Sequence, residues 1–151
     1  MKQFQGRVIV PGECRAEALV SRGGFNTLAS YQMALMFGDK QVKCGDQNNP
    51  DLYQKALAGT ALCLPETIGS TTGGMVLYSA GKLGSGPACL LFSRRADTLA
   101  LSGAVLLANW SDHPMVLIDE LGDEFLNTVQ EGQRIETKSD GTVIIHDEES
   151  A

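Results

Sequence analysis

Residues 64–77 read LPETIGSTTGGMVL, and the rest of the chain can be organised around this stretch. An apolar run over residues 60–64 enters it, and a segment over residues 75–82 with the pattern of a helix leaves it. The pattern predicts a strand, a tight turn and the N-terminus of a helix. Such a turn directs free backbone N–H groups and the positive end of the helix dipole to one point, where Ser70, Thr71 and Thr72 would help to bind an anion.

Two familiar types of site do not fit this stretch. A phosphate-binding P-loop ends in Gly-Lys followed by Ser or Thr, whereas Leu83 follows Lys82 here. The Gly-x-Ser-x-Gly spacing of a hydrolase nucleophile is also absent, because Ser70 directly follows Gly69. One alternative stays open: the hydroxyl residues form an ordinary helix N-cap, where Ser and Thr are preferred in any case.

Composition predicts one globular domain over residues 1–151, with an acidic, frayed tail over residues 146–151. The chain is 43% hydrophobic and 20% charged, which is sufficient for a core. Its net charge of −6 argues against a nucleic-acid partner and against an anionic membrane surface. The N-terminus has no signal-peptide pattern, and no apolar run approaches the ~18 residues of a membrane helix, so we expect a cytoplasmic protein.

The titratable residues offer no complete catalytic or metal site. The four cysteines, Cys14, Cys44, Cys63 and Cys89, are far apart and form no Cys-x-x-Cys pair. Cys63 and Cys89 fall in apolar runs and are expected to be buried, whereas Cys44 falls in a polar segment and is expected to be a surface thiol. This scarcity of ligands, together with a lone Ser70 at an anion-binding turn, predicts half of a reaction centre whose other half lies on another chain.

The rest of the chain predicts a mixed α/β fold. Strands are expected over residues 6–11 and 15–21, paired as a hairpin around Gly12. Residues 27–37 are ambiguous, but they are apolar enough for a short helix with a buried face. After the central turn, short buried runs suited to parallel strands with crossovers lie at 87–92, 104–108 and 114–118, with a turn at 100–103. A helix over residues 123–130 and a hairpin with strands at 133–137 and 142–146 close the chain.

Two further segments are candidates for ligand contact. Gly23 and Gly24 permit positive φ or a close ligand, and Arg22 beside them could hold a carboxylate or phosphate, although a plain surface turn with a solvated Arg22 is the favoured interpretation. The long connection over residues 38–58 contains Asp46. Long connections in compact domains are often functional, so Asp46 is a second candidate.

The order of several weak motifs resembles the swivel-domain small subunit of the aconitase X family. These motifs cover nearly the whole chain: Gly6-Arg7-Val8-Ile9-Val10, Gly23-Gly24, Asp46 with Asn49-Pro50, Leu64-Pro65, Gly69-Ser70-Thr71-Thr72-Gly73, Gly86-Pro87-Ala88, the run 103–108 and Asp140-Gly141-Thr142-Val143. The resemblance implies a swivelling β/β/α barrel that closes over a larger catalytic subunit. It also implies dehydration of a small hydroxy acid, in this chain most readily cis-3-hydroxy-L-proline, with phosphomevalonate as the other known substrate.

The resemblance also implies roles for particular residues. Ser70 would be the catalytic base, Gly69, Thr71 and Thr72 would line the substrate pocket, and Asp46 with Gly23 and Gly24 would lie at the closing face. The chain would bind no cofactor itself, because the iron or iron–sulfur cluster belongs to the large subunit, and it would be inactive alone. Departures from the family pattern at Arg22, Asn26 and Asn49 leave an alternative, a non-catalytic small-molecule-binding or regulatory module with the same fold.

Overall fold

The strands and helices of this computed structural model, which describes residues 1–39 and 41–147, form a mixed α/β fold. The strands are β1 (Lys2–Gln5), β2 (Arg7–Val10), β3 (Cys14–Val20), β4 (Phe25–Asn26), β5 (Ala61–Leu64), β6 (Thr67–Ile68), β7 (Cys89–Phe92), β8 (Val116–Asp119), β9 (Arg134–Thr137) and β10 (Thr142–His146). The helices are α1 (Thr27–Phe37), α2 (Gly73–Lys82), α3 (Thr98–Trp110) and α4 (Asp123–Thr128). Among the described residues, no helix is long and apolar enough to cross a membrane.

Eight of the strands form one sheet in the order β1-β10-β9-β3-β5-β7-β8-β2. Strands β3, β5, β7 and β8 run parallel, as the buried apolar runs predict, whereas β1, β10, β9 and β2 pair antiparallel with their neighbours. The two ends of the sheet, β1 and β2, are joined by the single residue Gly6, so the sheet must curl back on itself. A Cβ at Gly6 would lie 2.7 Å from the carbonyl oxygen of Asp119, so this corner requires glycine.

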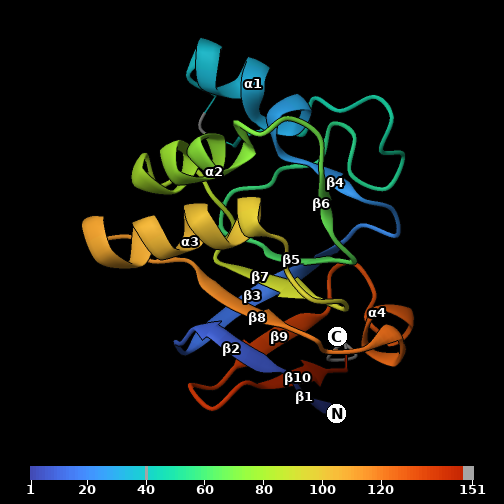
Figure 1. The fold of residues 1–151 in the computed structure, drawn as a ribbon. Helices are drawn as coiled ribbons and strands as arrows, with labels where there is room; N and C mark the ends of the chain where they lie inside the picture. The colour runs from blue at the N-terminus through green and yellow to red at the C-terminus, as the bar shows by residue number, and fades with distance from the viewer. Residues whose placement is uncertain (40, 148–151) are drawn as a thin grey trace.

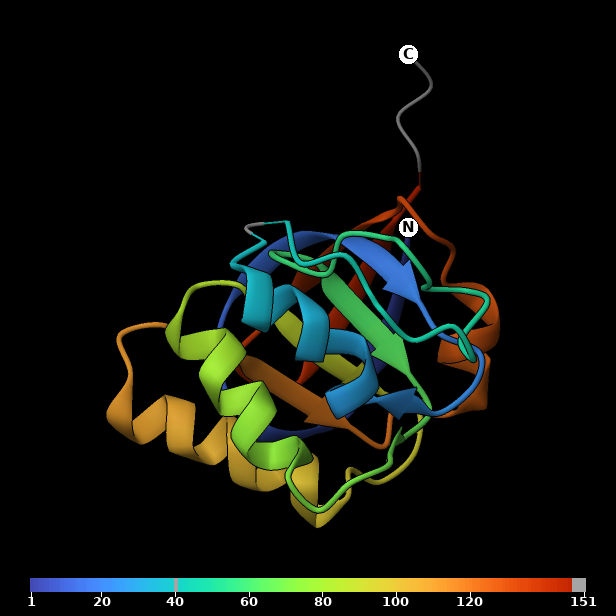
Figure 2. The same ribbon diagram turned by 90° about the horizontal axis from the view of Figure 1, so that it is seen from above.

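The helices lie outside the curled sheet (Figures 1 and 2). Helix α1 packs on α2 and α2 packs on α3, so the three form a layer, with α1 at one end of the molecule. One apolar core lies between this layer and the sheet and includes Phe25, Tyr31 and Phe92. A second core contains residues of the sheet and of α4, among them Phe125 and Ile135. Two separate cores fit the predicted β/β/α barrel.

The predicted hairpin around Gly12 is wrong. Strand β2 pairs with β8, and β3 pairs with β9 through Cys14–Glu17 and with β5 through Ala18–Val20. The last three residues of β3 are buried beside β5, and β3 lies in the middle of the sheet, where its antiparallel and parallel parts meet, rather than at the edge of a hairpin.

The predicted turn at 100–103 and strand at 104–108 are also wrong, because both belong to α3. The side chain of Asp97 caps this helix by accepting a hydrogen bond from the Ala100 N–H at 2.9 Å. A short apolar run fits a buried helix as well as a buried strand, so the cap is the feature that distinguishes them.

The C-terminal hairpin agrees with its prediction, since β9 and β10 pair antiparallel around a turn with Gly141 at φ +91°. The expected frayed tail begins later than residue 146, because His146 is the last residue of β10 and pairs with Arg134. The carboxylate of Asp147 contacts the N-terminal ammonium of Met1 at 2.5 Å. The remainder of that tail, residues 148–151, lies outside the described residues.

Candidate active-site loop

The loop over residues 69–72 joins β6 to α2 and carries the predicted catalytic serine. Gly69 adopts φ +103°, a conformation that favours glycine, and turns the chain toward Ser70. The Ser70 hydroxyl is exposed, accepts a hydrogen bond from the Thr72 N–H at 3.2 Å and lies 2.9 Å from the Thr72 hydroxyl. Thr71 is exposed as well. The loop therefore presents three hydroxyl groups to the surrounding solvent.

The Ser70 loop does not act as an ordinary N-cap for α2. Thr72 occupies the N-cap position, but its side chain makes no capping hydrogen bond. The amide of Gly73 donates to the Ser70 carbonyl at 3.0 Å and that of Val76 to the Thr72 carbonyl at 3.1 Å. No hydrogen bond is found from the amides of Gly74 or Met75 to any of the described residues. The helix start thus keeps unpaired N–H groups beside exposed hydroxyls, as an anion-binding turn requires.

The start of α1 lies against the same loop. Strands β4 and β6 form a small parallel sheet in which Phe25 pairs with Thr67 and Asn26 with Ile68. Asn26 caps α1 by accepting a hydrogen bond from the Ala29 N–H at 3.1 Å, and its side chain would lie 2.7 Å from a Cβ at Gly69. A Cβ at Gly73 would lie 3.7 Å from that of Thr27. The N-termini of α1 and α2 therefore converge on Ser70.

Gly24 lies close to the loop as predicted for a closing face, but the contact is with the chain itself. A Cβ at Gly24 would meet the Ile68 side chain at 2.7 Å, whereas a Cβ at Gly23 would meet nothing within 4 Å. Gly24 thus permits close packing of β4 on β6, and Gly23 leaves an open surface. Of the two glycines, Gly24 packs against the residue that precedes Gly69.

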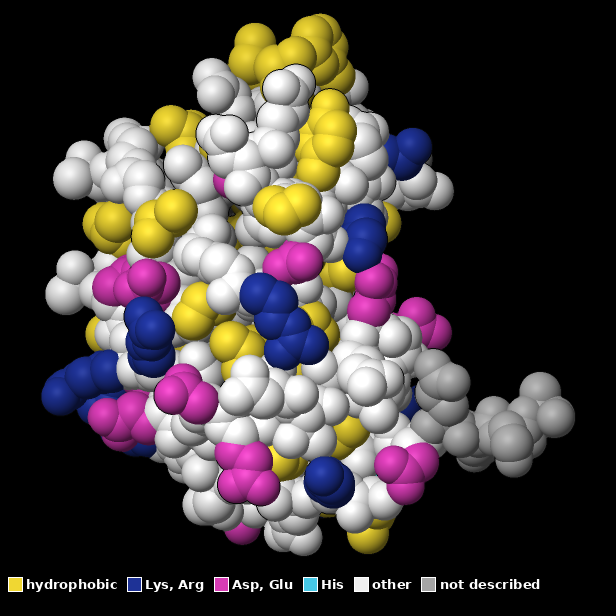
Figure 3. Space-filling model, turned by 90° about the vertical axis from the view of Figure 1, so that its right-hand side faces the viewer, with side chains coloured by type: hydrophobic (Ala, Val, Ile, Leu, Met, Phe, Trp, Pro, Cys, Tyr) yellow, Lys and Arg dark blue, Asp and Glu magenta, His cyan; other side chains and the backbone are white. Residues whose placement is uncertain are grey.

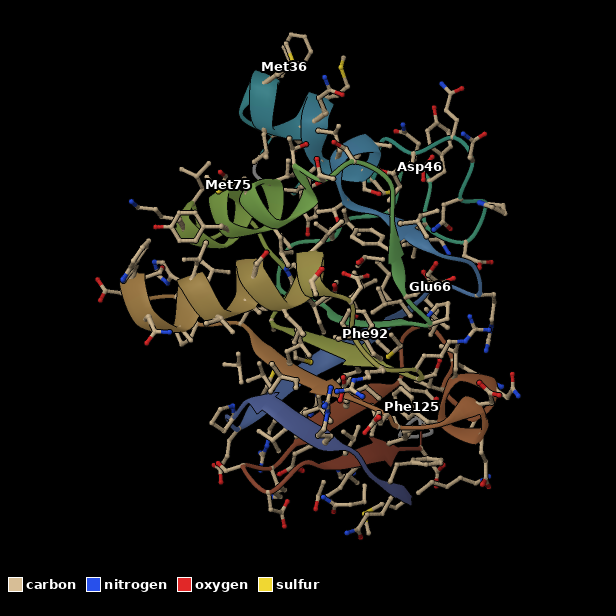
Figure 4. All side chains as sticks on the ribbon, in the orientation of Figure 1. Met36, Asp46, Glu66, Met75, Phe92 and Phe125 are labelled. Carbon is tan, nitrogen blue, oxygen red and sulfur yellow. The ribbon has the colours of Figure 1, made fainter. Side chains whose placement is uncertain are left out.

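Asp46 is almost fully buried, with 6% of its surface exposed. Its Oδ1 accepts the Asn48 N–H at 3.0 Å, which closes a turn within the long connection. The neighbouring Gly45 donates to the Ser30 carbonyl of α1 at 3.0 Å, and Figure 4 shows Asp46 beside α1 and β6. The connection therefore packs against the helix that backs the Ser70 loop, but no hydrogen bond joins Asp46 to that loop.

Arg22 is exposed, and its guanidinium already holds hydrogen bonds within the chain. It donates to the Leu126 carbonyl and, at 3.3 Å, to the Val129 carbonyl at the C-terminal end of α4. Helix C-termini leave carbonyl groups unpaired, and a cation there also suits the helix dipole. Arg22 is exposed, as the favoured interpretation expects, and its guanidinium also caps α4, which the sequence did not indicate.

The sequence analysis missed Asp97. Besides capping α3, its second oxygen accepts a hydrogen bond from the Thr67 hydroxyl, which ties β6 to the start of α3. The sequence signal for this role is the position of Asp97, three residues before Ala100 and directly before a 13-residue helix. The signal was overlooked because residues 100–103 were interpreted as a turn. Arg94 follows β7 and forms an ion pair with Glu66 at 3.6 Å, which places one cation near the strand that leads to the loop.

The cysteines are structural, with one correction. Cys63 and Cys89 are buried as predicted, and burial raises the pKa of the Cys63 thiol. Cys44 is fully buried, so the expected surface thiol is wrong. The polar residues around it supply backbone hydrogen bonds instead, since Cys44 donates to the Lys55 carbonyl at 2.9 Å and accepts from Gln54 at 2.8 Å.

These features define a small α/β domain that offers one open half of a site. The domain presents Ser70 on its surface between two helix starts, and a cavity of about 600 Å³ lies elsewhere, lined by Arg15, Glu136 and His146 among others. The chain belongs to the aconitase X swivel-domain family, whose model matches residues 3–145. The family resemblance and the fold class predicted from the sequence are both confirmed.

Relatives and a solved structure extend this result. The chain is 29% identical to the phosphomevalonate dehydratase small subunit of Aeropyrum pernix, over 93% of this chain and 91% of the relative. It is 29% identical to the protein of the same name from Methanocella arvoryzae, over 93% and 94% of the two chains. The crystal structure of Thermococcus kodakaraensis aconitase X matches with a TM-score of 0.76 and 26% identity, over 97% and 100%. The predicted class, a small subunit of a dehydratase, is confirmed.

Proposed function

We propose that this chain is the closing half of a dehydratase active site, in which Ser70 takes a proton from a small hydroxy acid bound by the large subunit. The observation that carries this proposal is the setting of Ser70. Its hydroxyl is exposed at the convergence of two helix starts and already accepts a hydrogen bond from the Thr72 N–H at 3.2 Å. A serine in that setting suits proton transfer to a substrate that approaches from outside the chain.

The surroundings of Ser70 favour its ionised form. A serine hydroxyl is a weak base until it loses its proton, and hydrogen bonds donated to the resulting alkoxide lower the cost of that loss. The Thr72 N–H and the Thr72 hydroxyl, 2.9 Å away, are in place to donate to Ser70 Oγ. The positive ends of the α1 and α2 dipoles add to the effect. The alkoxide then takes a proton from the carbon next to the one that loses the hydroxyl group.

The iron or iron–sulfur centre that the family resemblance implies does not fit this chain. Within residues 1–39 and 41–147, no group of three or more His, Cys, Asp or Glu side chains is placed to hold a metal ion. The cysteines named above lie in the core, where they serve packing. We therefore assign the metal centre to the large subunit and the proton transfer to this one.

Phosphomevalonate is the first substrate to test, because the relatives described above carry that name. The unpaired amides at the start of α2 suit either a phosphate or a carboxylate, since both are anions with several acceptor oxygens. The preference for cis-3-hydroxy-L-proline that came from the sequence is retained as the second candidate. Both compounds are small hydroxy acids, and an assay of the assembled enzyme with each compound distinguishes them as substrates.

The alternative of a non-catalytic module loses its main support. That alternative rested on departures at Arg22, Asn26 and Asn49, and each of these side chains has a structural role. Arg22 caps α4 and Asn26 caps α1. Asn49 is buried, donates to the Ser21 hydroxyl at 2.9 Å and accepts from the Leu52 N–H at 3.2 Å. The departures therefore have structural roles, and one of them, Asn26, packs against Gly69 at the start of the Ser70 loop.

The proposal is tested by reconstitution. The chain is co-expressed with the dehydratase large subunit from the same genome, and loss of phosphomevalonate and of cis-3-hydroxy-L-proline is followed separately. The assembled pair should convert one of them, and neither subunit should do so alone. Equal conversion by the large subunit alone, or an assembled iron-loaded pair that converts neither compound, would contradict the proposal.

A further inference from the structure

Helix α1 carries apolar side chains on two opposite faces. Tyr31 and Ala34 face the core and are buried. Met33, Met36 and Phe37 lie on the other face, with 55%, 69% and 74% of their surfaces exposed. A surface helix normally keeps its outer face polar, and a helix that is apolar all round is normally covered on both sides. Within the described residues, α1 is covered on one side only.

The exposed face of α1 continues toward the active-site loop. Ile68, just before Gly69, is 47% exposed, and Met75, in the first turn of α2, is 59% exposed. We call Met33, Met36, Phe37, Ile68 and Met75 the apolar rim. Figure 4 shows Met36 and Met75 on the two neighbouring helices at the α1 end of the molecule, and Figure 3 shows hydrophobic side chains gathered at that same end. None of the rim side chains carries a charge.

A surface of this kind is typical of a protein interface. Large apolar side chains are normal on a surface when they are scattered, whereas a group beside a functional loop marks a site of association. Methionine and aromatic residues are also enriched at interfaces, and methionine adapts its shape to a partner. Ile68 and Met75 flank Ser70, and Met33, Met36 and Phe37 extend the rim along α1, so a partner that covers the whole rim also contacts the Ser70 loop.

We infer that the apolar rim is the surface on which the dehydratase large subunit docks, through an uncharged apolar face of its own. The choice of partner rests on the proposed function. A second copy of this chain fits less well, because it would cover Ser70 with another Ser70 and would bring no cluster of metal ligands, given the residues that the structure describes. The large subunit supplies what the Ser70 loop lacks, and docking on the rim brings the two halves together.

The chain offers a matched control surface. Leu83 and Trp110 are each 71% exposed and lie at the C-terminal ends of α2 and α3. Leu83 follows α2 and Trp110 ends α3, so neither belongs to the exposed face of α1 that carries the substituted methionines. The control residues match the rim in exposure and hydrophobicity and differ in position.

The test compares Met33→Lys/Met36→Lys with Leu83→Lys/Trp110→Lys by titration calorimetry against the purified large subunit. The rim variant should bind at least tenfold more weakly than wild type, because two charges would be buried in an apolar interface, and the control should bind within about twofold. Both should keep the melting temperature of the wild type, since the substituted side chains are exposed. The inference would be overturned if the rim variant bound the large subunit as tightly as the wild type does. It would also be overturned if the control bound more than about twofold more weakly than the wild type, or if the wild-type chain did not bind.

Two further readouts separate this inference from neighbouring ideas. If light scattering shows a dimer of the isolated chain that the rim variant splits, with binding of the large subunit unchanged, the rim belongs to self-association and the inference is overturned. Turnover by Ser70→Ala tests the proposed function independently. Loss of binding in the rim variant together with normal turnover by Ser70→Ala would uphold the docking surface and refute Ser70 as the base.

Discussion

The side chain of Asn26 occupies the space that a Cβ on residue 69 would need. The built Cβ position at Gly69 lies 2.7 Å from Asn26 Oδ1 and 2.8 Å from Asn26 Cγ. The same Oδ1 accepts the Ala29 N–H at 3.1 Å and so caps α1. One residue therefore both begins a helix and supports the glycine that precedes Ser70, the proposed catalytic serine. Because of this contact, the position of Ser70 depends on a residue 44 positions earlier in the chain.

Gly69→Ala should displace the Ser70 loop. The substitution strains a residue at φ +103° and places a methyl group against Asn26, so we expect a loss of about 2 kcal/mol in the free energy of unfolding and at least tenfold lower turnover. Gly84→Ala is the control, because Gly84 has φ +74° and open space around it. The control should lose about 1 kcal/mol and keep its turnover. Equal turnover by both variants would show that the contact with Asn26 does not position Ser70.

Asn26→Ala should remove the cap of α1 at a cost of about 1 kcal/mol in the free energy of unfolding, measured by urea denaturation. Asn26→Asp should recover most of this loss, since a carboxylate oxygen can accept the Ala29 N–H and suits the helix dipole. An Asp variant as unstable as the Ala variant would argue that the packing of the amide on Gly69, rather than the cap, is what stabilises the fold.

Arg22→Gln should destabilise the chain without lowering the turnover of the assembled enzyme. The lost hydrogen bonds to the Leu126 and Val129 carbonyls are partly exposed, so a loss of about 1 kcal/mol is expected. Arg15→Gln, at a guanidinium that is 74% exposed, should change the free energy of unfolding by less than about 0.5 kcal/mol. A loss of turnover with unchanged stability would instead assign Arg22 to substrate binding.

Glu136 should make the chain sensitive to acid. Its carboxylate lies 2.8 Å from the Lys138 ammonium and 3.1 Å from the His146 ring, and these hydrogen bonds lower its pKa from 4.5 to about 2. A lowered pKa adds stability above pH 4.5 that is lost as the pH falls toward 2. The melting temperature should therefore fall over that range, and Glu136→Gln should flatten the slope. Glu17→Gln, which lies in none of these ion pairs, should leave the slope unchanged.

The parts of the fold that were predicted correctly have strong local signals. The apolar run of β5, the hydroxyl-rich turn and the start of α2 follow one another within a few residues, and the Asp140-Gly141 pair marks the last hairpin. The strand expected at 104–108 failed because α3 is apolar on nearly all sides, so its pattern has no helical period to detect. The pairing of strands also depends on residues that are far apart in the sequence. Nothing in the local sequence of β2 or β3 indicates that they pair with β8 and β9.

The candidate site likewise contains residues with a local sequence signal and residues without one. The turn and helix start around Ser70 were predicted from one short stretch, because unpaired amides at a helix start depend on local geometry, and the catalytic role of Ser70 stays a proposal. Asp97 was missed, since its bond to Thr67 spans 30 positions. The capping role of Arg22 could not be predicted for the same reason, since the carbonyls that it caps lie over 100 positions away. Burial of Cys44 likewise comes from how the long connection packs on α1, which composition does not reveal.

The most direct test of the central claim is the turnover of Ser70→Ala in the assembled enzyme. The variant and the wild type are each purified with the iron-loaded large subunit, and assembly is verified by light scattering before dehydration is assayed. We predict that the variant assembles like the wild type and that its turnover is at least about a hundredfold lower, since a proton-transfer group contributes on the order of 10²–10⁴. Thr71→Val, beside it in the same exposed loop, should keep turnover within about tenfold. A Ser70→Ala enzyme that assembles normally and turns over like the wild type would contradict the account.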